Sequence, residues 1–209
     1  MKFSLPPIYP ITDKDLAKRP THLSIIKELV RGGATLVQVR DKFTPPRELL
    51  LDLQRCVEFA LSKGIALIVN DRCDLALSSN AMGVHLGQED LPAEAARAIL
   101  GRKKIIGLST NTLVQVKQAA SLPIQYIGFG PIYATSTKGN LPPALGLHGL
   151  ARASRASRLP IVAIGGIGLG QVREILDAGA ASAAVISALM TSSNLSREME
   201  RILKEARRK

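Results

Sequence analysis

Cysteine, tryptophan and long apolar runs are scarce or absent in this sequence. Its 209 residues include two cysteines, Cys56 and Cys73, and no tryptophan. Two cysteines alone make neither a disulfide framework nor a zinc site, so we expect free thiols in a reducing compartment. Residues 1–13 contain three prolines and lack the pattern of a signal peptide. The weakly polar stretch at residues 178–190 is too short to span a bilayer. These absences predict a cytoplasmic protein without a membrane partner.

Aromatic residues make up only 3% of the chain, although hydrophobic residues reach 46%. The core must therefore be built from isoleucine, leucine, valine and alanine. Such a core suits a layered parallel sheet better than an aromatic-rich β-sandwich.

Acidic residues are few beside basic ones, with 17 Asp and Glu against 28 Lys and Arg, a net charge of +11. That balance favours anionic partners, either nucleic acid or phosphorylated small molecules. Much of the excess lies in residues 197–209, where an apolar stripe at helical spacing accompanies the basic residues. The stripe consists of Leu195, Met199, Ile202 and Leu203. Because no aromatic stacking platform accompanies the charge, we predict a docked terminal helix and no nucleic-acid partner.

Short β-rich runs alternate with helical patterns along the whole chain, which predicts one domain over residues 1–209. The predicted strands span residues 8–12, 36–40, 66–70, 83–86, 105–108, 126–129, 161–164 and 183–186. The predicted helices begin near Thr21, Pro45, Asp74, Pro92, Thr112, Leu147, Leu169 and Ser196. Strands that alternate with helices pair in parallel, and eight such units close into a (β/α)8 TIM barrel. An open doubly wound sheet is the structural alternative.

Two cations and an amide follow the second predicted strand. Gln38, Arg40 and Lys42 alternate with Val39 and Asp41, so they share one face of an extended chain. An Arg fork with a Lys point charge suits a phosphate or diphosphate. The alternative is a pair of ordinary surface charges at a strand end.

Two carboxylates, Asp71 and Asp90, follow the third and fourth predicted strands. Neighbouring strands lie ~5 Å apart, so both can hold one Mg²⁺ shared with substrate phosphate oxygens. The alternative is that either residue only caps a helix.

Glycines and hydroxyl residues follow the last three predicted strands. Gly165-Gly166 and Ile186-Ser187 stand where this fold usually binds phosphate. Residues 134–144 contain Thr135, Thr137 and Lys138 and predict a loop that closes over the barrel mouth. The alternative is a plain connection.

The three histidines are scattered and predict no general base. His22 is expected at a helix start, His148 on an exposed helix, and His85 either in the barrel lining or in the core.

Taken in chain order, several stretches resemble the thiamine phosphate synthase family. They are PIYPITD at residues 7–13, GGATLVQVRDK at 32–42, VNDRCDLAL at 69–77, GVHLGQEDLP at 83–92, IIGLST at 105–110, GFGPIYATSTKG at 128–139, IVAIGGI at 161–167 and AAVISAL at 183–189. The resemblance covers nearly the whole chain, and the combination of Q-x-R-x-K, N-D-R, H-L-G-Q-x-D and T-x-T-K is specific.

The resemblance implies a transferase that joins a pyrimidine diphosphate to a thiazole phosphate and releases pyrophosphate. It implies that the diphosphate is held by Gln38, Arg40, Lys42, Asn70, Ser109 and Lys138. It implies that the thiazole phosphate is bound by Thr135, Thr137, Gly166, Ile186 and Ser187. Asp71 and Asp90 are the implied Mg²⁺ ligands, and Arg40, Lys42, Ser109 and Lys138 are the implied catalytic residues.

The sequence departs from the family pattern at four positions. Asp41 stands where Glu is usual, Met82 where Asp is usual, Asn111 where His is frequent and Ala134 where Pro is common. None of these removes an implied ligand, but Asn111 puts in doubt any role of the residue there. Two alternatives stay open, a thiazole tautomerase-like isomerase on the same barrel and a non-catalytic binder of a phosphate ligand or nucleic acid. A homo-oligomer also stays open.

Overall fold

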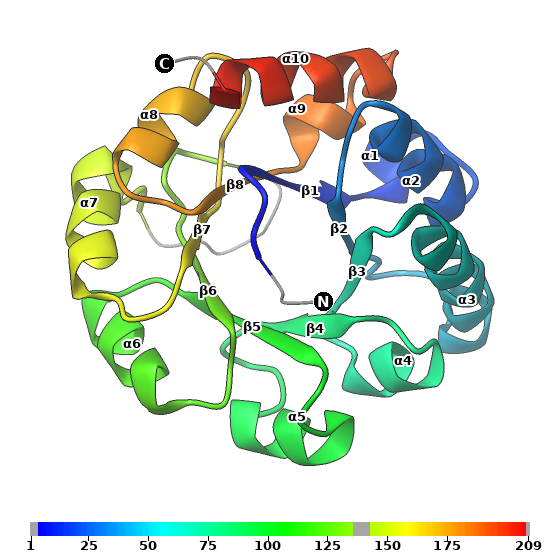
Figure 1. The fold of residues 1–209 in the computed structure, drawn as a ribbon, viewed down its shortest axis with the longest axis horizontal. Coiled ribbons are helices and arrows are strands. Elements are labelled where there is room, and N and C mark those ends of the chain that lie inside the picture. The colour runs from blue at the N-terminus through cyan, green and yellow to red at the C-terminus, as the bar shows by residue number, and fades with distance from the viewer. Residues whose placement is uncertain (1–3, 136–142, 208–209) are drawn as a thin grey trace.

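A closed barrel of parallel strands lies at the centre of the structure, and helices surround it (Figure 1). The computed structural model describes residues 4–135 and 143–207. Within these ranges the strands are β1 (Ile8–Thr12), β2 (Leu36–Val39), β3 (Ala66–Asn70), β4 (Gly83–Leu86), β5 (Ile105–Thr110), β6 (Tyr126–Phe129), β7 (Ile161–Ala163) and β8 (Ser182–Val185). Each strand pairs with the next, and β8 pairs with β1. The predicted (β/α)8 barrel is confirmed, and the open sheet is excluded because β8 pairs with β1 and closes the ring.

The helices follow the predicted order with two additions. They are α1 (Lys14–Ala17), α2 (His22–Arg31), α3 (Pro46–Lys63), α4 (Cys73–Ser78), α5 (Ala93–Leu100), α6 (Leu113–Gln118), α7 (Gly146–Ala156), α8 (Val172–Asp177), α9 (Ser187–Met190) and α10 (Leu195–Arg207), with a 3-10 turn η1 at Ala119–Ser121. The short helices α1 and α9 were not predicted, because four residues are too few to show a helical period. The helix predicted near Leu169 begins at Val172, because Gly170 has a φ of 89° that a right-handed helix does not contain.

The C-terminal helix α10 packs against α2, α8 and α9 and lies outside the strands where the barrel closes (Figure 1). Leu195, Met199 and Ile202 are fully buried in this contact. The predicted docked helix is therefore confirmed. In the two described ranges, no helix is long and apolar enough to cross a membrane.

The strands are buried on both faces, as parallel strands between two apolar layers must be. Side chains alternate between the layers: Leu67 and Val69 of β3 face the helices, whereas Ile68 faces the barrel interior. The interior cluster consists of Tyr9, Ile11, Leu36, Ile68, Ile105, Tyr126, Val162 and Ala184.

Tyr126 fits into the interior because its neighbour on β5 has no side chain. A Cβ atom added to Gly107 would lie 2.1 Å from Cζ of the Tyr126 ring. The ring is fully buried and cannot swing into open space. Gly107 is therefore required by packing.

We expect Gly107→Ala to lower the free energy of unfolding by about 1–3 kcal/mol, because overpacking forces the buried ring to move. Gly168→Ala is the matched control, since its Cβ would meet its nearest neighbours at 3.8 Å. The control should stay within about 0.5 kcal/mol of the parent. Urea unfolding measures both, and equal stabilities of the two variants would contradict this packing account.

Candidate active site

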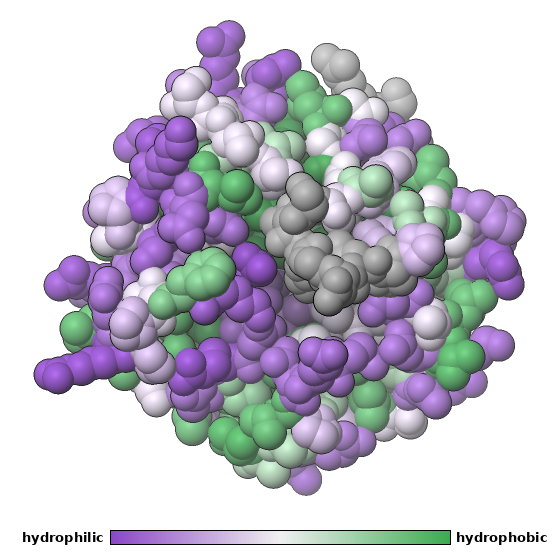
Figure 2. Space-filling model, turned by 180° about the vertical axis from the view of Figure 1, so that it is seen from behind, coloured by the Kyte–Doolittle hydropathy of each residue, from purple (hydrophilic) through white to green (hydrophobic). Residues whose placement is uncertain are grey.

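The C-terminal ends of the strands surround a cavity of about 630 Å³, a volume typical of small-molecule sites. Figure 2 shows this face of the molecule, on which hydrophilic residues predominate. Nine of the predicted site residues line the cavity. They are Arg40, Lys42, Asp71, Asp90, Ser109, Thr135, Gly166, Ile186 and Ser187.

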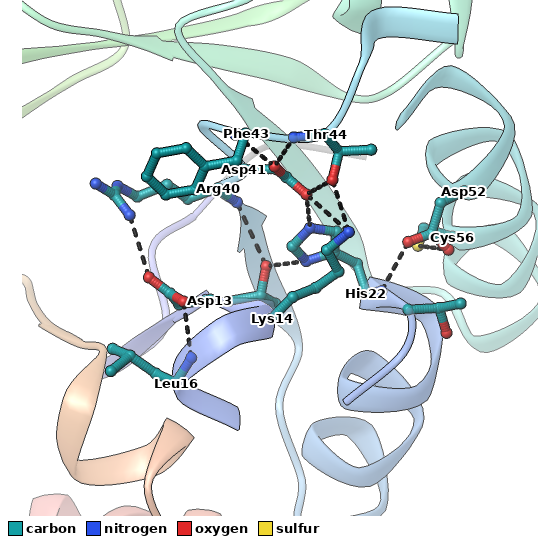
Figure 3. Close-up of polar contacts among 12 residues, drawn as sticks. Asp13, Lys14, Leu16, His22, Arg40, Asp41, Phe43, Thr44, Asp52 and Cys56 are labelled. Atoms are coloured by element: carbon teal, nitrogen blue, oxygen red, sulfur yellow. Dashed lines mark hydrogen bonds and ion pairs between the residues drawn. The ribbon is translucent and has the colours of Figure 1, made fainter. Parts of the chain in front are cut away.

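Two cations enter the cavity from the loop after β2. Arg40 keeps only 12% of its side chain exposed, and its Nη1 lies 3.2 Å from Oδ2 of Asp13. Figure 3 shows this ion pair. Its buried Nε has no hydrogen-bond partner among the described residues. Lys42 is more exposed and forms an ion pair with Asp71. Both cations thus stand at the cavity wall, each paired with a carboxylate.

Two carboxylates lie next to these cations, after β3 and β4. Asp71 has a left-handed backbone with a φ of 62°, which costs free energy in a residue other than glycine. Its N–H donates to the carbonyl of His85 at 2.8 Å. Asp90 accepts a hydrogen bond from the Gly87 N–H at 2.6 Å. Burial raises the pKa of Asp90, and the neighbouring Asp71 raises it further. The two carboxylates are therefore close enough to interact.

Neither carboxylate caps a helix. The N-cap of α4 is Arg72 and that of α5 is Pro92, and neither helix has a side-chain cap. The capping alternative for Asp71 and Asp90 is therefore wrong. Across residues 4–135 and 143–207, no three His, Cys, Asp or Glu side chains gather as a metal cluster. A metal ion here would bind at most these two carboxylates of the described residues and would need other ligands to complete its coordination shell.

A chain of hydrogen bonds runs through the barrel interior beneath the cavity. The Ser109 hydroxyl lies 3.0 Å from His85 Nε2, and His85 Nδ1 lies 3.0 Å from the Tyr126 hydroxyl. Tyr126 and Tyr9 join their hydroxyls at 2.9 Å, and Gln38 Nε2 donates to Tyr9 at 3.1 Å. His85 thus faces the barrel interior and holds a predicted catalytic hydroxyl.

The opposite side of the mouth is formed by backbone and small residues. Gly165 and Gly166 have φ of 102° and 67°. A Cβ on Gly166 would lie 2.5 Å from the Ala134 carbonyl, so the loop after β7 packs tightly on the segment after β6. Ser187 begins α9 beside this loop. In an eight-stranded ring, β7 and β8 lie across from β3 and β4, so this side faces the two carboxylates.

The remaining predicted site residues lie elsewhere. Gln38 and Asn70 line a hollow of about 20 Å³ under Arg40. Thr137 and Lys138 lie outside the described residues. Sequence reasoning missed two partners, Asp13 for Arg40 and His85 for Ser109. A single sequence carries no signal for such pairs, because each joins residues that are far apart in the chain.

Comparisons with a family model, with curated relatives and with solved structures all lead to the same family. A family described as thiamine monophosphate synthase matches residues 8–189. A thiamine-phosphate synthase of Syntrophomonas wolfei is 39% identical over 196 residues, which cover 93% of each chain. One of Vibrio parahaemolyticus is 42% identical and covers 94% of this chain and 96% of the relative. A solved thiamine phosphate pyrophosphorylase of Pyrococcus furiosus superposes with a TM-score of 0.86 at 33% identity, covering 96% of each chain.

The pKa values of the tyrosines in and beside the site are all raised, so we expect these side chains to lose their protons at unusually high pH. Burial raises the pKa of Tyr9 and Tyr126 well above 10, whereas burial and Glu174 raise that of Tyr133 to about 12. These are the three tyrosines of the chain. Tyrosines of the unfolded chain lose their protons near pH 10. Stability should therefore hold up to about pH 10 and fall as the pH rises from there towards 12.

Absorbance at about 295 nm measures tyrosinate. We expect this absorbance to show no step near pH 10 as long as circular dichroism shows a folded protein. On alkaline unfolding, the tyrosinate absorbance of all three tyrosines should rise together. A one-tyrosine step near pH 10 in the folded state would contradict the assigned environments.

Proposed function

The chain belongs to the thiamine monophosphate synthase family, and from that membership we propose how its barrel mouth makes thiamine phosphate. Thiamine-phosphate synthases are transferases. The proposed substrates are 4-amino-2-methyl-5-hydroxymethylpyrimidine diphosphate and 4-methyl-5-(2-hydroxyethyl)thiazole phosphate, and the second product is pyrophosphate.

One observation carries the proposal for the diphosphate end. Arg40, Lys42, Asp71 and Asp90 all line the same cavity, on the side formed by β2, β3 and β4. The two cations match the oxygens of a diphosphate, with Arg as a fork and Lys as a point charge. The buried Nε of Arg40 adds a donor that no described residue accepts. We therefore assign this side to the diphosphate.

The two carboxylates fit Mg²⁺. This ion prefers hard oxygen ligands and is usually held by one or two carboxylates together with substrate phosphates. Asp71 and Asp90 supply such oxygens, and both line the same cavity. Mg²⁺ bound there would neutralise charge on the diphosphate oxygens. Lys42, paired with Asp71, already supplies positive charge at the same place.

The thiazole phosphate is assigned to the opposite side of the mouth. Gly166, Ile186, Ser187 and Thr135 line the cavity there, and backbone amides of glycine loops are common phosphate donors in this fold. Thr137 is proposed to bind the thiazole phosphate and Lys138 the diphosphate, as the family resemblance implies. The two phosphates would thus sit on opposite walls, with the reacting atoms between them.

The chemistry needs charge stabilisation and no protein nucleophile. The bond between the pyrimidine methylene carbon and the diphosphate oxygen breaks, and the electron pair leaves with pyrophosphate. The lone pair of the thiazole nitrogen then forms the new carbon–nitrogen bond, so no proton has to be removed. Arg40, Lys42 and Lys138 would stabilise the leaving group, while Ser109, held by His85, would help to orient the pyrimidine diphosphate.

The alternatives lack this support. An isomerase acting on a thiazole phosphate needs neither the cation pair nor the two carboxylates that share the cavity. A non-catalytic binder is disfavoured by membership of a family of thiamine-phosphate synthases. Location in the cytoplasm, small molecules as partners and assembly into a homo-oligomer stay predictions.

Pyrophosphate release tests the proposal. We expect release only with both substrates and Mg²⁺ present, and a loss of about 100- to 1000-fold in kcat for Asp71→Asn, the size typical of losing one electrostatic contact in a transition state. Asp74→Asn is the matched control, because Asp74 is an exposed carboxylate three residues away that pairs with Arg72. It should keep activity within about twofold.

If Asp71→Asn and Asp74→Asn lose kcat equally, the loss comes from a disturbed local fold and not from a missing metal ligand. Release that ignores Mg²⁺ would remove the proposed ion site. No release from folded protein would overturn the proposed function.

A further inference from the structure

His22 is a buried side chain that the proposed chemistry does not use. It is the first residue of α2 and only 1% exposed. Its ring lies 2.7 Å from Thr12 Oγ1 through Nδ1 and 3.0 Å from Asp41 Oδ2 through Nε2. Its backbone N–H donates to Asp52 Oδ2 of α3 at 2.7 Å. Figure 3 shows the ring fixed between the end of β1 and the loop after β2.

Counting protons gives this network a direction. The Arg40 N–H donates to Thr12 Oγ1 at 3.3 Å. Because Nε2 lies against the ionised carboxylate of Asp41, we assign His22 the neutral Nε2–H tautomer, which donates to Asp41. Nδ1 of this tautomer accepts the hydroxyl proton of Thr12. In this arrangement Thr12 Oγ1 accepts one hydrogen bond from Arg40 and donates one to His22. These hydrogen bonds lead from the backbone of Arg40 through Thr12 and His22 to the side chain of Asp41, the next residue. The series therefore begins and ends on neighbouring residues of the loop after β2.

Asp41 in turn holds the whole loop. Its carboxylate accepts from the Phe43 N–H at 3.0 Å, from the Thr44 N–H at 2.8 Å and from the Thr44 hydroxyl at 2.7 Å. Lys14 Nζ lies 3.3 Å away. Burial alone would raise the pKa of Asp41, but the hydrogen bonds from His22, Thr44 and Phe43 outweigh it and hold the pKa well below its usual range. The ionised carboxylate is therefore a firm anchor.

The neighbours of Asp41 point the other way. Arg40 and Lys42 both line the cavity, whereas Asp41 turns from it towards α2. A shift of Asp41 would therefore move both cations together. We propose that His22 is a positioning residue, which through Thr12 and Asp41 sets the backbone of Arg40 and Lys42 for the diphosphate. This inference rests on the proposed function, in which these two cations grip the diphosphate.

The proposal predicts a selective loss of affinity. Without the ring, the loop keeps its own hydrogen bonds to Asp41 and the contacts of Arg40 with Thr12 and Asp13. The Asp41 carboxylate, however, loses its connection through His22 to Thr12 of β1. Misplacement by about 1 Å can cost up to about 100-fold in an oriented site. The affinity for the thiazole phosphate, which is assigned to the loops after β7 and β8, should not change.

The test compares His22→Leu with His22→Gln, which keeps an amide donor for Asp41. Calorimetry with inorganic pyrophosphate and Mg²⁺ gives affinity without turnover, and steady-state kinetics give KM for each substrate. We expect His22→Leu to bind pyrophosphate about tenfold more weakly, the scale of one lost charge-assisted contact, and to raise KM for the pyrimidine diphosphate. KM for the thiazole phosphate should change by less than about twofold, and His22→Gln should recover part of the loss.

Thr21→Ala is the matched control for stability. Thr21 caps α2, because its side chain accepts a hydrogen bond from the Ser24 N–H at 3.2 Å. It takes no part in the hydrogen bonds that connect Arg40 with Asp41 through Thr12 and His22. This variant should lose about 1 kcal/mol of stability and keep both its pyrophosphate affinity and its KM values. Thr12→Val is the second variant if His22→Leu does not fold, because it cuts the same chain next to Arg40. It should also weaken pyrophosphate binding.

Unchanged pyrophosphate affinity in His22→Leu or Thr12→Val would overturn the inference and leave the proposed function intact. Absence of pyrophosphate binding by the parent protein would instead overturn the proposed function on which the inference rests.

Discussion

Closure of the barrel by β8 on β1 is the constraint on which the site depends. Ile8 pairs with Ala183 and Pro10 with Val185, and all eight strands of the ring run in the same direction. Every residue that follows a strand must therefore emerge at the same end. Arg40 and Ser187 are far apart in the chain and yet line the same cavity for this reason alone. The aliphatic core makes this arrangement possible, because it buries both faces of every strand.

Charge is distributed unevenly around this mouth. Two cations and two carboxylates occupy the side of β2 to β4, and glycines with small polar residues occupy the side of β7 and β8. The first side suits a highly charged group that must leave, and the second suits a phosphate that only anchors its molecule. The left-handed backbone of Asp71 is a local cost that the surrounding structure tolerates at this point. In the proposed function, this arrangement would allow substitution at carbon without a protein nucleophile.

Much of this could be predicted from the sequence, because the relevant signals are local. The alternation of strands and helices predicted the barrel, and the polar residues after Val39, Asn70 and Leu86 predicted the charged side of the mouth. The family resemblance added the two proposed substrates. What remained hidden were contacts between distant residues, such as Arg40 with Asp13. Neither periodicity nor composition carries information on such pairs, because they depend on which loops the closed ring brings together. The helix-cap alternative for Asp71 could likewise be rejected only from the backbone around Arg72.

The most direct test of this account is a crystal structure with Mg²⁺, pyrophosphate and thiamine phosphate bound together. The account predicts pyrophosphate against Arg40 and Lys42, an ion on Asp71 and Asp90, and the thiazole phosphate beside Gly166 and Ser187. Pyrophosphate bound at the glycine loop, or an ion held away from both carboxylates, would contradict it.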